Sequence, residues 1–281
     1  MDAIRLGPFL LDERLAQGGM GEVWGGVHGD RGVPVAVKLI RAEVFDEAAE
    51  RDFEREVWAQ ARLDHPSVVY LFDQGRLDEE AAAAFGMPVG APWLAMERCS
   101  SRLSDQKLDW QGLRQVVIPL LGALAHAHSR GVLHRDIKIA NVLVSTAEDL
   151  RPGVKLADFG IAHVLADDDE QTRSAGTPRY MAPEQVMADW EQHGPWTDLY
   201  AMGVLTWRLV MKRRPWSDLQ GRQLLMAMLR QDLPWLEPAI AVPPGLKGWL
   251  QRMTHKDPVK RYQLAADALA DFQSLPVLEL D

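Results

Sequence analysis

The stretch of sequence that decides the fold is His134-Arg135-Asp136-Ile137-Lys138-Ile139-Ala140-Asn141. It combines an imidazole, a guanidinium, a carboxylate, an ammonium and a carboxamide, and the apolar run Val142-Leu143-Val144 that follows predicts a short buried strand. Polar chemistry beside a core strand needs a reason, because unpaired buried charge is costly. A phosphoryl-transfer site supplies one, with an Asp to take the proton of a hydroxyl, a Lys to offset phosphate charge and an Asn to hold a metal ion.

Length and composition limit the classes of protein to consider. The chain has 281 residues, 47% apolar and 25% charged, as expected for a globular protein of one large domain or two small lobes. The formal net charge of −9 argues against a general nucleic-acid or anionic-membrane surface. Cys99 is the only cysteine, which excludes an intramolecular disulfide and favours a cytoplasmic setting. With no apolar run of about 18 residues and no signal-peptide core at the start, we expect no membrane span.

The first 40 residues predict a sheet that carries a glycine-rich turn. Residues 9–40 alternate short apolar runs with glycine clusters, the pattern of a twisted antiparallel sheet. Gly18 and Gly21 lie between two such runs, where glycine lets backbone N–H groups approach phosphate oxygens. Taken alone, this segment would be interpreted as a plain turn.

Two charged residues stand next to apolar positions in the first 60 residues. Lys38 lies in the apolar strand 34–40, and Glu56 lies beside the apolar stripe of a predicted helix over 46–63. A lysine in such a strand is usually an edge residue, and most helix glutamates are solvated. A desolvated ammonium, however, needs a partner of opposite charge.

The 134–141 stretch resembles the catalytic loop of protein kinases, H-R-D-x-x-x-x-N, and further motifs of that family follow in order. They are the glycine loop up to Val23, the Lys38 strand, Glu56, Asp158-Phe159-Gly160, the segment Gly176-Thr177-Pro178-Arg179-Tyr180-Met181-Ala182-Pro183-Glu184, Asp198 to Gly203, and Asp257-Pro258-Val259-Lys260-Arg261. The resemblance covers roughly residues 8–272. The chain resembles the eukaryotic-like (Hanks-type) Ser/Thr protein kinases, and the segment 18–23 is particularly similar to the bacterial branch. Lys138 and Thr177 favour Ser/Thr over Tyr acceptors.

The resemblance implies an α+β bilobal fold. It predicts a kinase domain over 8–273, with an N-lobe of about 8–97 that holds a five-stranded antiparallel sheet and the αC helix. The hinge would span about 97–100, the mainly helical C-lobe about 101–273, and a short tail 274–281. The pattern places the fourth and fifth strands at 68–73 and 93–97, a surface loop at 77–92 and a long helix at 116–129.

The resemblance also implies the residues of the active site. Asp136, Lys138, Lys38 and Glu56 would be catalytic, with Glu56 of the αC helix paired to Lys38. Asn141 and Asp158 would hold Mg²⁺. The predicted ATP-binding residues are Leu15, Ala16, Gly18, Gly19, Gly21, Val23, Ala36, Lys38, Met96, Glu97, Cys99 and Leu143. Two positions depart from the family pattern: Ala16 replaces the first glycine of the loop, and Gln60 replaces an apolar residue that supports the Phe of the DFG motif.

Regulatory and structural roles follow from the same motifs. Arg135 would bind a regulatory phosphate on the activation segment, for which Thr172, Ser174 and Thr177 are the candidate sites, and Lys155 could be a second cation for it. Phe159, Glu184, Asp198 and Arg261 would be structural.

The predicted function is therefore transfer of the γ-phosphoryl group of Mg-ATP to protein Ser/Thr hydroxyls, regulated by autophosphorylation of the activation loop. Expected partners are protein substrates and, for autophosphorylation, a second copy of the chain. No nucleic-acid partner and no membrane span in this chain are expected. Two alternatives remain: a pseudokinase that binds nucleotide without turnover, and a kinase-fold enzyme acting on a small molecule. The second is disfavoured by the intact segment 176–184, which in protein kinases supports the acceptor peptide. The chain would be a free-standing cytoplasmic enzyme or the kinase part of a longer protein.

Overall fold

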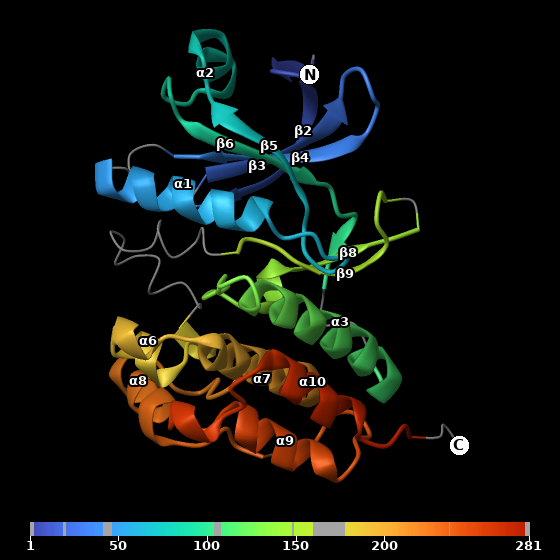
Figure 1. Ribbon diagram of the computed structural model, residues 1–281, viewed down its shortest axis with the longest axis vertical. Helices are drawn as coiled ribbons and strands as arrows, with labels where there is room; N and C mark the ends of the chain where they lie inside the picture. The colour runs from blue at the N-terminus through green and yellow to red at the C-terminus, as the bar shows by residue number, and fades with distance from the viewer. Residues whose placement is uncertain are drawn as a thin grey trace.

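The computed structural model describes residues 3–18, 21–41, 47–103, 108–147, 149–159, 178–235 and 237–278. A smaller lobe built on a β-sheet sits above a larger helical lobe (Figure 1). The predicted bilobal α+β fold is confirmed.

The N-lobe sheet has six strands in the order β1-β2-β3-β4-β6-β5, with antiparallel neighbours. Its strands are β1 (Ile4–Leu6), β2 (Phe9–Gly18), β3 (Gly21–His28), β4 (Pro34–Ile40), β5 (Leu71–Arg76) and β6 (Pro92–Glu97). The prediction of five strands missed β1, which adds an edge to the sheet beside β2. The predicted fourth strand was placed too early: β5 begins at Leu71, while Val68 instead pairs with Leu156 from the segment below.

Alternation along β4 separates the two faces of this sheet. Val35, Val37 and Leu39 belong to the apolar cluster on one face, and Ala36 and Ile40 to the cluster on the other. Because successive strand residues point to opposite faces, Lys38 shares the face of Ala36 and Ile40. Helix α1 (Glu47–Ala61) packs against that second face (Figure 1).

The segment between β5 and β6 was predicted to be a surface loop, and this prediction was wrong. Residues Glu79–Phe85 form helix α2, which begins after the N-cap Asp78 and ends at Gly86 in a left-handed conformation with φ 63°. Asp78 Oδ1 accepts a hydrogen bond from Ala81 N at 2.8 Å, which satisfies one of the free N–H groups of the first turn. The ring of Phe85 meets Trp24 edge-on at 5.3 Å, so α2 covers the first face of the sheet.

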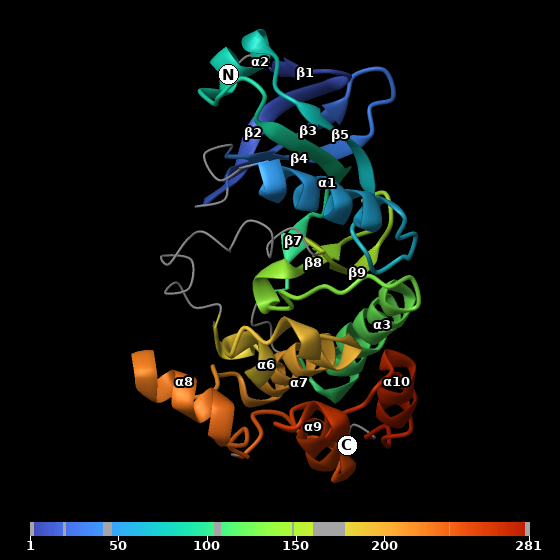
Figure 2. The same ribbon diagram turned by 60° about the vertical axis from the view of Figure 1, so that its left-hand side comes forward.

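The C-lobe is built around helix α7 (Pro195–Met211), which is buried along most of its length. Around it pack α3 (Trp110–His128), α9 (Gly245–Met253) and α10 (Ala265–Gln273) in one continuous apolar core. Helix α3 begins six residues earlier than predicted, after the N-cap Asp109. Helix α6 (Pro183–Val186) is short, and α8 (Gly221–Arg230) extends away from the body of the lobe (Figure 2).

A small three-stranded sheet lies where the two lobes meet. Its strands are β7 (Ser101–Arg102), β8 (Val142–Ser145) and β9 (Gly153–Leu156). Two hydrogen bonds connect β9 to the chain that leaves α1: Val69 N to Leu156 O at 3.0 Å and Leu156 N to Ser67 O at 2.9 Å. The predicted strand after the catalytic loop is confirmed as β8, in which Val142 is buried while Leu143 and Val144 are partly exposed.

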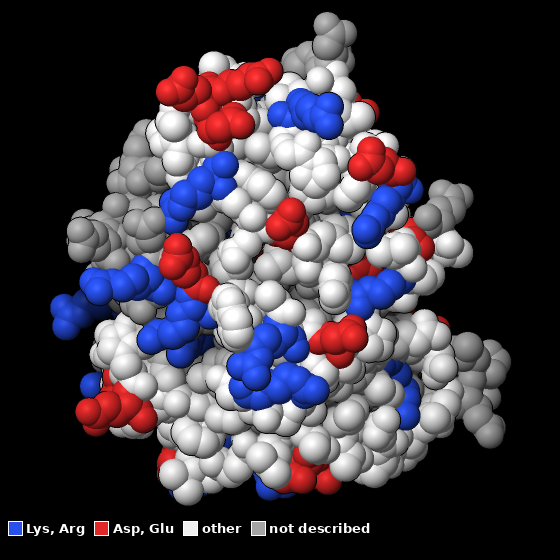
Figure 3. All heavy atoms as spheres, turned by 45° about the horizontal axis from the view of Figure 1, so that its top comes forward, with Lys and Arg blue, Asp and Glu red and all other residues white. Residues whose placement is uncertain are grey.

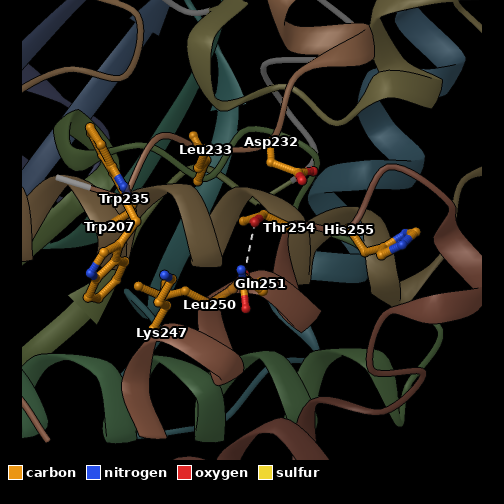
Figure 4. A pocket seen from close by; sticks show the side chains of 9 residues that line it. All are labelled: Trp207, Asp232, Leu233, Trp235, Lys247, Leu250, Gln251, Thr254 and His255. Carbon is orange, nitrogen blue, oxygen red and sulfur yellow. Dashed lines mark hydrogen bonds between the residues drawn. The ribbon is translucent and has the colours of Figure 1, made fainter. Parts of the chain in front are cut away.

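A hollow of about 240 Å³ lies between α7, α9 and the chain after α8 (Figure 4). Its lining residues are Trp207, Asp232, Leu233, Trp235, Lys247, Leu250, Gln251, Thr254 and His255, and it includes none of the predicted active-site residues.

On the face seen in Figure 3, acidic and basic side chains are interspersed rather than gathered by sign. Within the described ranges, no helix combines the length and apolar character needed to cross a bilayer.

Charged side chains are buried beneath α6. Arg261 donates to both carboxylate oxygens of Glu184, at 2.7 and 2.9 Å, and both side chains are almost fully buried. Nearby, Lys256 Nζ donates to Tyr200 Oη at 2.9 Å and to Met228 O at 2.7 Å. Burial lowers the pKa of Lys256 to about 8.

This lysine predicts a pH dependence of stability. Its pKa is lower in the folded than in the unfolded protein, so between about pH 8 and 10 the unfolded chain binds more protons and stability rises with pH. We expect the free energy of unfolding of the wild type to rise by about 1 kcal/mol per pH unit relative to Lys256→Met over this range. Urea denaturation of both proteins at pH 8, 9 and 10 measures this difference in the free energy of unfolding. The exposed Lys260→Met is the control, and a constant difference between wild type and Lys256→Met would contradict the prediction.

Candidate active site

The catalytic loop brings three predicted side chains together. Lys138 Nζ lies 2.7 Å from Asp136 Oδ2. Asn141, at the end of the 3₁₀ helix η2 (Ile139–Asn141), donates from Nδ2 to Asp136 O at 2.8 Å and to Asp136 Oδ2 at 3.0 Å. Because Asn141 Nδ2 donates to Asp136, the carboxamide is oriented so that its Oδ1 is the atom that can bind a metal ion or accept a hydrogen bond. Asp136 is thus a carboxylate fixed between a cation and an amide.

His134 supports this loop from below. Its backbone N–H donates to Asp198, while its ring accepts from Asp136 N at Nδ1 (3.2 Å) and donates from Nε2 to Ala157 O (3.0 Å). These partners define the neutral tautomer with hydrogen on Nε2. Complete burial lowers the pKa of His134 and keeps it in this form. The ring also contacts Phe159, with centroids 4.6 Å apart, so the loop and the Asp158-Phe159 segment are packed together.

Lys38 reaches the site from β4. Its Nζ lies 2.8 Å from Asp158 Oδ1. Burial acts to raise the pKa of Asp158, but the ammonium of Lys38 more than offsets this, and the pKa lies below its ordinary value. Glu56 is in α1, but its side chain lies outside the described part of the structure, so the Lys38–Glu56 pair stays a prediction. The described partner of Lys38 is Asp158.

Apolar residues predicted to surround adenine gather in one cluster on the lower face of the sheet. Ala36 and Met96 are buried in it, and Val23, Cys99 and Leu143 pack against it with partial exposure. Leu15 is 39% exposed on β2. The cluster therefore joins β3, β4, β6 and β8, and its upper and lower parts come from different lobes.

The glycine-rich turn is built on the ends of β2 and β3. Ala16 pairs with Val23 across the hairpin, and Gly18 pairs with Gly21. Gly21 has φ 138°, and a Cβ there would lie 1.9 Å from Leu39 O, so this position requires glycine. Gly19 lies outside the described residues.

Glu97 was predicted as a hinge residue, and its side chain has a further role. It is almost fully buried, with Oε2 2.6 Å from Arg151 Nη2 and Oε1 3.1 Å from Lys155 Nζ. Lys155 is completely buried and also donates to Pro66 O at 2.7 Å. The prediction that Lys155 could be a second cation for a regulatory phosphate was wrong, because this ammonium is completely buried and paired with Glu97.

The remaining predicted residues divide into described and undescribed ones. Asp198 Oδ1 accepts from Arg135 N at 2.7 Å, and its Oδ2 accepts from His134 N and His128 Nε2, both at 2.8 Å. Burial acts to raise the pKa of Asp198, but these donors more than offset it and the pKa is lowered. The candidate phosphosites Thr172, Ser174 and Thr177 lie outside the described residues, so their role and the phosphate site at Arg135 stay predictions.

Gln60, the second departure from the family pattern, is buried in α1. It is 4% exposed, and its Oε1 has no hydrogen-bond partner among the described residues. A buried unpaired amide oxygen is destabilising.

Sequence reasoning missed three contributions to the site. The ring of His134 and the carboxamide of Gln185 fix backbone groups of the catalytic loop. The guanidinium of Arg151 fixes the buried carboxylate of Glu97. The motif containing His134 was found, but the role of its ring was not. Gln185 stands directly after Glu184, although a single glutamine carries no pattern that reveals its partners.

Comparison with known proteins agrees with this geometry. Residues 9–271 match the protein kinase domain family. The chain is 32% identical over 269 residues to the serine/threonine-protein kinase Pkn1 of Myxococcus xanthus, covering 92% of this chain and 37% of Pkn1. It is 30% identical over 280 residues to the serine/threonine-protein kinase PknA of Mycobacterium tuberculosis, covering 94% of this chain and 61% of PknA.

The fold is also similar to a solved structure, the PknI kinase domain of Mycobacterium tuberculosis. The TM-score is 0.69 at 26% identity, and the match covers 97% of this chain and 98% of that one. The chain therefore belongs to the protein kinase family, among the bacterial Hanks-type Ser/Thr protein kinases. It spans less than two thirds of the length of the curated relatives named above.

Proposed function

We propose that this chain transfers the γ-phosphoryl group of ATP to Ser and Thr hydroxyls of proteins, with Asp136 as the base that orients the acceptor. The observation that carries the proposal is the arrangement of Asp136, Lys138 and Asn141 in one loop, with Lys38 and Asp158 paired across from it. Catalysis of phosphoryl transfer depends mainly on positioning and electrostatics, which such a set supplies.

Each side chain then has a separate task. The hydroxyl oxygen of the acceptor bonds to the γ-phosphorus while the bond between that phosphorus and the ADP oxygen breaks. Asp136 accepts the proton that the hydroxyl loses. Lys138, 2.7 Å from that carboxylate, can stabilise negative charge on the transferring group. Lys38 carries the cation that β4 directs toward the phosphates. Glu56 is assigned as its partner in the nucleotide-bound state.

The donor set fits a magnesium ion. Asn141 Oδ1 and the carboxylate of Asp158 are oxygen ligands, which Mg²⁺ prefers. When bound, the ion would neutralise phosphate charge. The lowered pKa of Asp158 keeps its carboxylate ionised and able to coordinate.

The proposal includes a regulatory part, for which the sequence motifs are the support. Arg135 would bind a phosphate on Thr172, Ser174 or Thr177, added by a second copy of the chain. Residues 8–273 are the proposed catalytic domain and 274–281 a tail. A cytoplasmic location is proposed from the single cysteine.

The test is phosphoryl transfer from Mg-ATP to a mixture of Ser- and Thr-containing peptides, with small-molecule alcohols and sugars as competing acceptors. We expect phosphopeptides, no transfer in excess EDTA, and turnover reduced by about 100-fold or more in Lys38→Met because the cation facing the phosphates is lost. Exposed Lys247→Met is the control. Wild-type turnover by Lys38→Met would contradict the assignment. Phosphorylation of the small molecules alone would replace the proposed acceptor class.

A further inference from the structure

Arg135, immediately before the catalytic Asp136, has an unusual backbone. Its φ is +64°, in the left-handed region that residues with a side chain seldom occupy. Such a conformation persists only where surrounding groups hold it in place. The peptide group between Arg135 and Asp136 sets the direction in which the Asp136 side chain leaves the chain, so the groups that hold it also position the proposed base.

Three side chains fix this turn of the backbone. Asp198 accepts from Arg135 N at 2.7 Å, and His134 Nδ1 accepts from Asp136 N at 3.2 Å. The third is Gln185, in α6, whose Nε2 donates to Arg135 O at 2.8 Å. The peptide group between Arg135 and Asp136 is thus bound at both ends, its oxygen by Gln185 and its N–H by His134.

The other end of the same carboxamide is also used. Gln185 Oε1 accepts a hydrogen bond from Ala182 N at 3.1 Å. An amide has one donor end and one acceptor end, and here a carbonyl faces the first and an N–H faces the second. The orientation of the amide is therefore fixed. Gln185 connects the Met181-Ala182-Pro183 segment, which the family pattern assigns to support of the acceptor peptide, to the backbone at Asp136.

We propose that Gln185 is a positioning residue for phosphoryl transfer. Its carboxamide holds the Arg135–Asp136 peptide group and transmits the position of the acceptor-supporting segment to the proposed base. The idea rests on the proposed function of Asp136, but the hydrogen bonds of Gln185 can be tested apart from it.

Gln185→Glu separates the two hydrogen bonds of the amide. Its carboxylate keeps the acceptor for Ala182 N, but when ionised it cannot donate to Arg135 O. We expect kcat with a peptide acceptor to fall about 10- to 100-fold at pH 7.5, with KM for ATP within about twofold of wild type, because misplaced catalytic groups react slowly. Gln185→Met removes both hydrogen bonds at similar size and should lose at least as much.

The pH profile distinguishes positioning from loss of structure. Once protonated, the carboxyl group that Gln185→Glu introduces can again donate to Arg135 O. With an ordinary glutamate pKa, about 6% of it is protonated at pH 5.5, so the activity ratio of this variant to wild type should rise from pH 7.5 to 5.5 by about 1.5-fold after a 10-fold loss and about sixfold after a 100-fold loss. Gln185→Met should show no such recovery. The titratable and charged groups around position 185, namely Arg135, Asp136, Lys138, Glu184 and Asp198, are shared by all variants, so their own titrations cancel in the ratio. Gln223→Glu, exposed on α8, is the matched control.

Hydrogen exchange of the peptide that contains residues 134–141 gives a reading independent of turnover. Faster exchange in both Gln185 variants, at a melting temperature close to wild type, supports the positioning role. If the wild type phosphorylates no peptide but this faster exchange is seen, the proposed function is wrong while the positioning role still stands. Turnover within twofold of wild type, a flat pH ratio or unchanged exchange in Gln185→Glu would overturn the proposal.

Discussion

Asp136→Asn is expected to lower the rate of peptide phosphorylation by about 10²- to 10⁴-fold, the usual contribution of a general base. The substitution preserves shape and the hydrogen-bond acceptor for Asn141 Nδ2, but it removes the charge that attracts the hydroxyl proton and faces Lys138 Nζ at 2.7 Å. The loss should therefore appear in kcat, with nucleotide affinity close to wild type.

The measurement is turnover by mass spectrometry of a phosphorylated peptide, together with the melting temperature and the Kd for ATP. Asp73→Asn, at an exposed position of β5, serves as the control and should keep wild-type turnover. An Asp136→Asn protein with more than a tenth of wild-type turnover would show that another group accepts the proton. Nucleotide binding by a wild type without any turnover would instead favour the pseudokinase alternative.

Arg261→Leu is expected to destabilise the protein by about 3–5 kcal/mol, because it leaves the carboxylate of Glu184 buried without its cation. Arg261 Nη1 and Nη2 hold both oxygens of Glu184, and Thr197 Oγ1 adds a hydrogen bond at 2.9 Å. Both charged side chains are at most 1% exposed, so water cannot replace the lost partner.

Chemical denaturation of the two variants Arg261→Leu and Arg252→Leu provides the comparison. Arg252 pairs with Asp271 at 3.4 Å, but both side chains are about half exposed, and its loss should cost less than about 1 kcal/mol. The double variant Glu184→Met/Arg261→Met should recover part of the stability lost in Arg261→Leu, since no unpaired charge remains. Equal losses for Arg261→Leu and Arg252→Leu would contradict the role given to burial.

The catalytic loop could be predicted from the sequence because its chemical groups are contiguous. Asp136, Lys138 and Asn141 stand within six residues, and the structure brings them into contact as expected. The β-branched apolar run of residues 34–40 likewise predicted a strand with Lys38 in its centre, and that strand is present. Local sequence patterns of this kind are sufficient to predict the local structure, because the interacting residues are close together in the sequence.

Other features depend on contacts that local patterns do not contain. Lys155 was assigned to a regulatory site because nothing in its own strand shows that Glu97 lies opposite it. Helix α2 was missed because residues 77–92 are acidic and rich in Gly and Pro as well as Ala, a composition typical of surface loops. The capping signals were present, with Asp78 before the helix and Gly86 after it, and would have indicated a helix.

The register of strand β4 fixes both the packing of its apolar side chains and the position of Lys38. It is paired on both sides, with Lys38 opposite Val23 of β3 and Leu94 of β6. A deletion of one residue within the strand would exchange its faces, moving Lys38 into the apolar cluster under α2 and an apolar side chain toward Asp158. Stability and turnover would be lost together, so natural length variation in this lobe belongs in turns such as residues 29–33, where added residues leave the register intact.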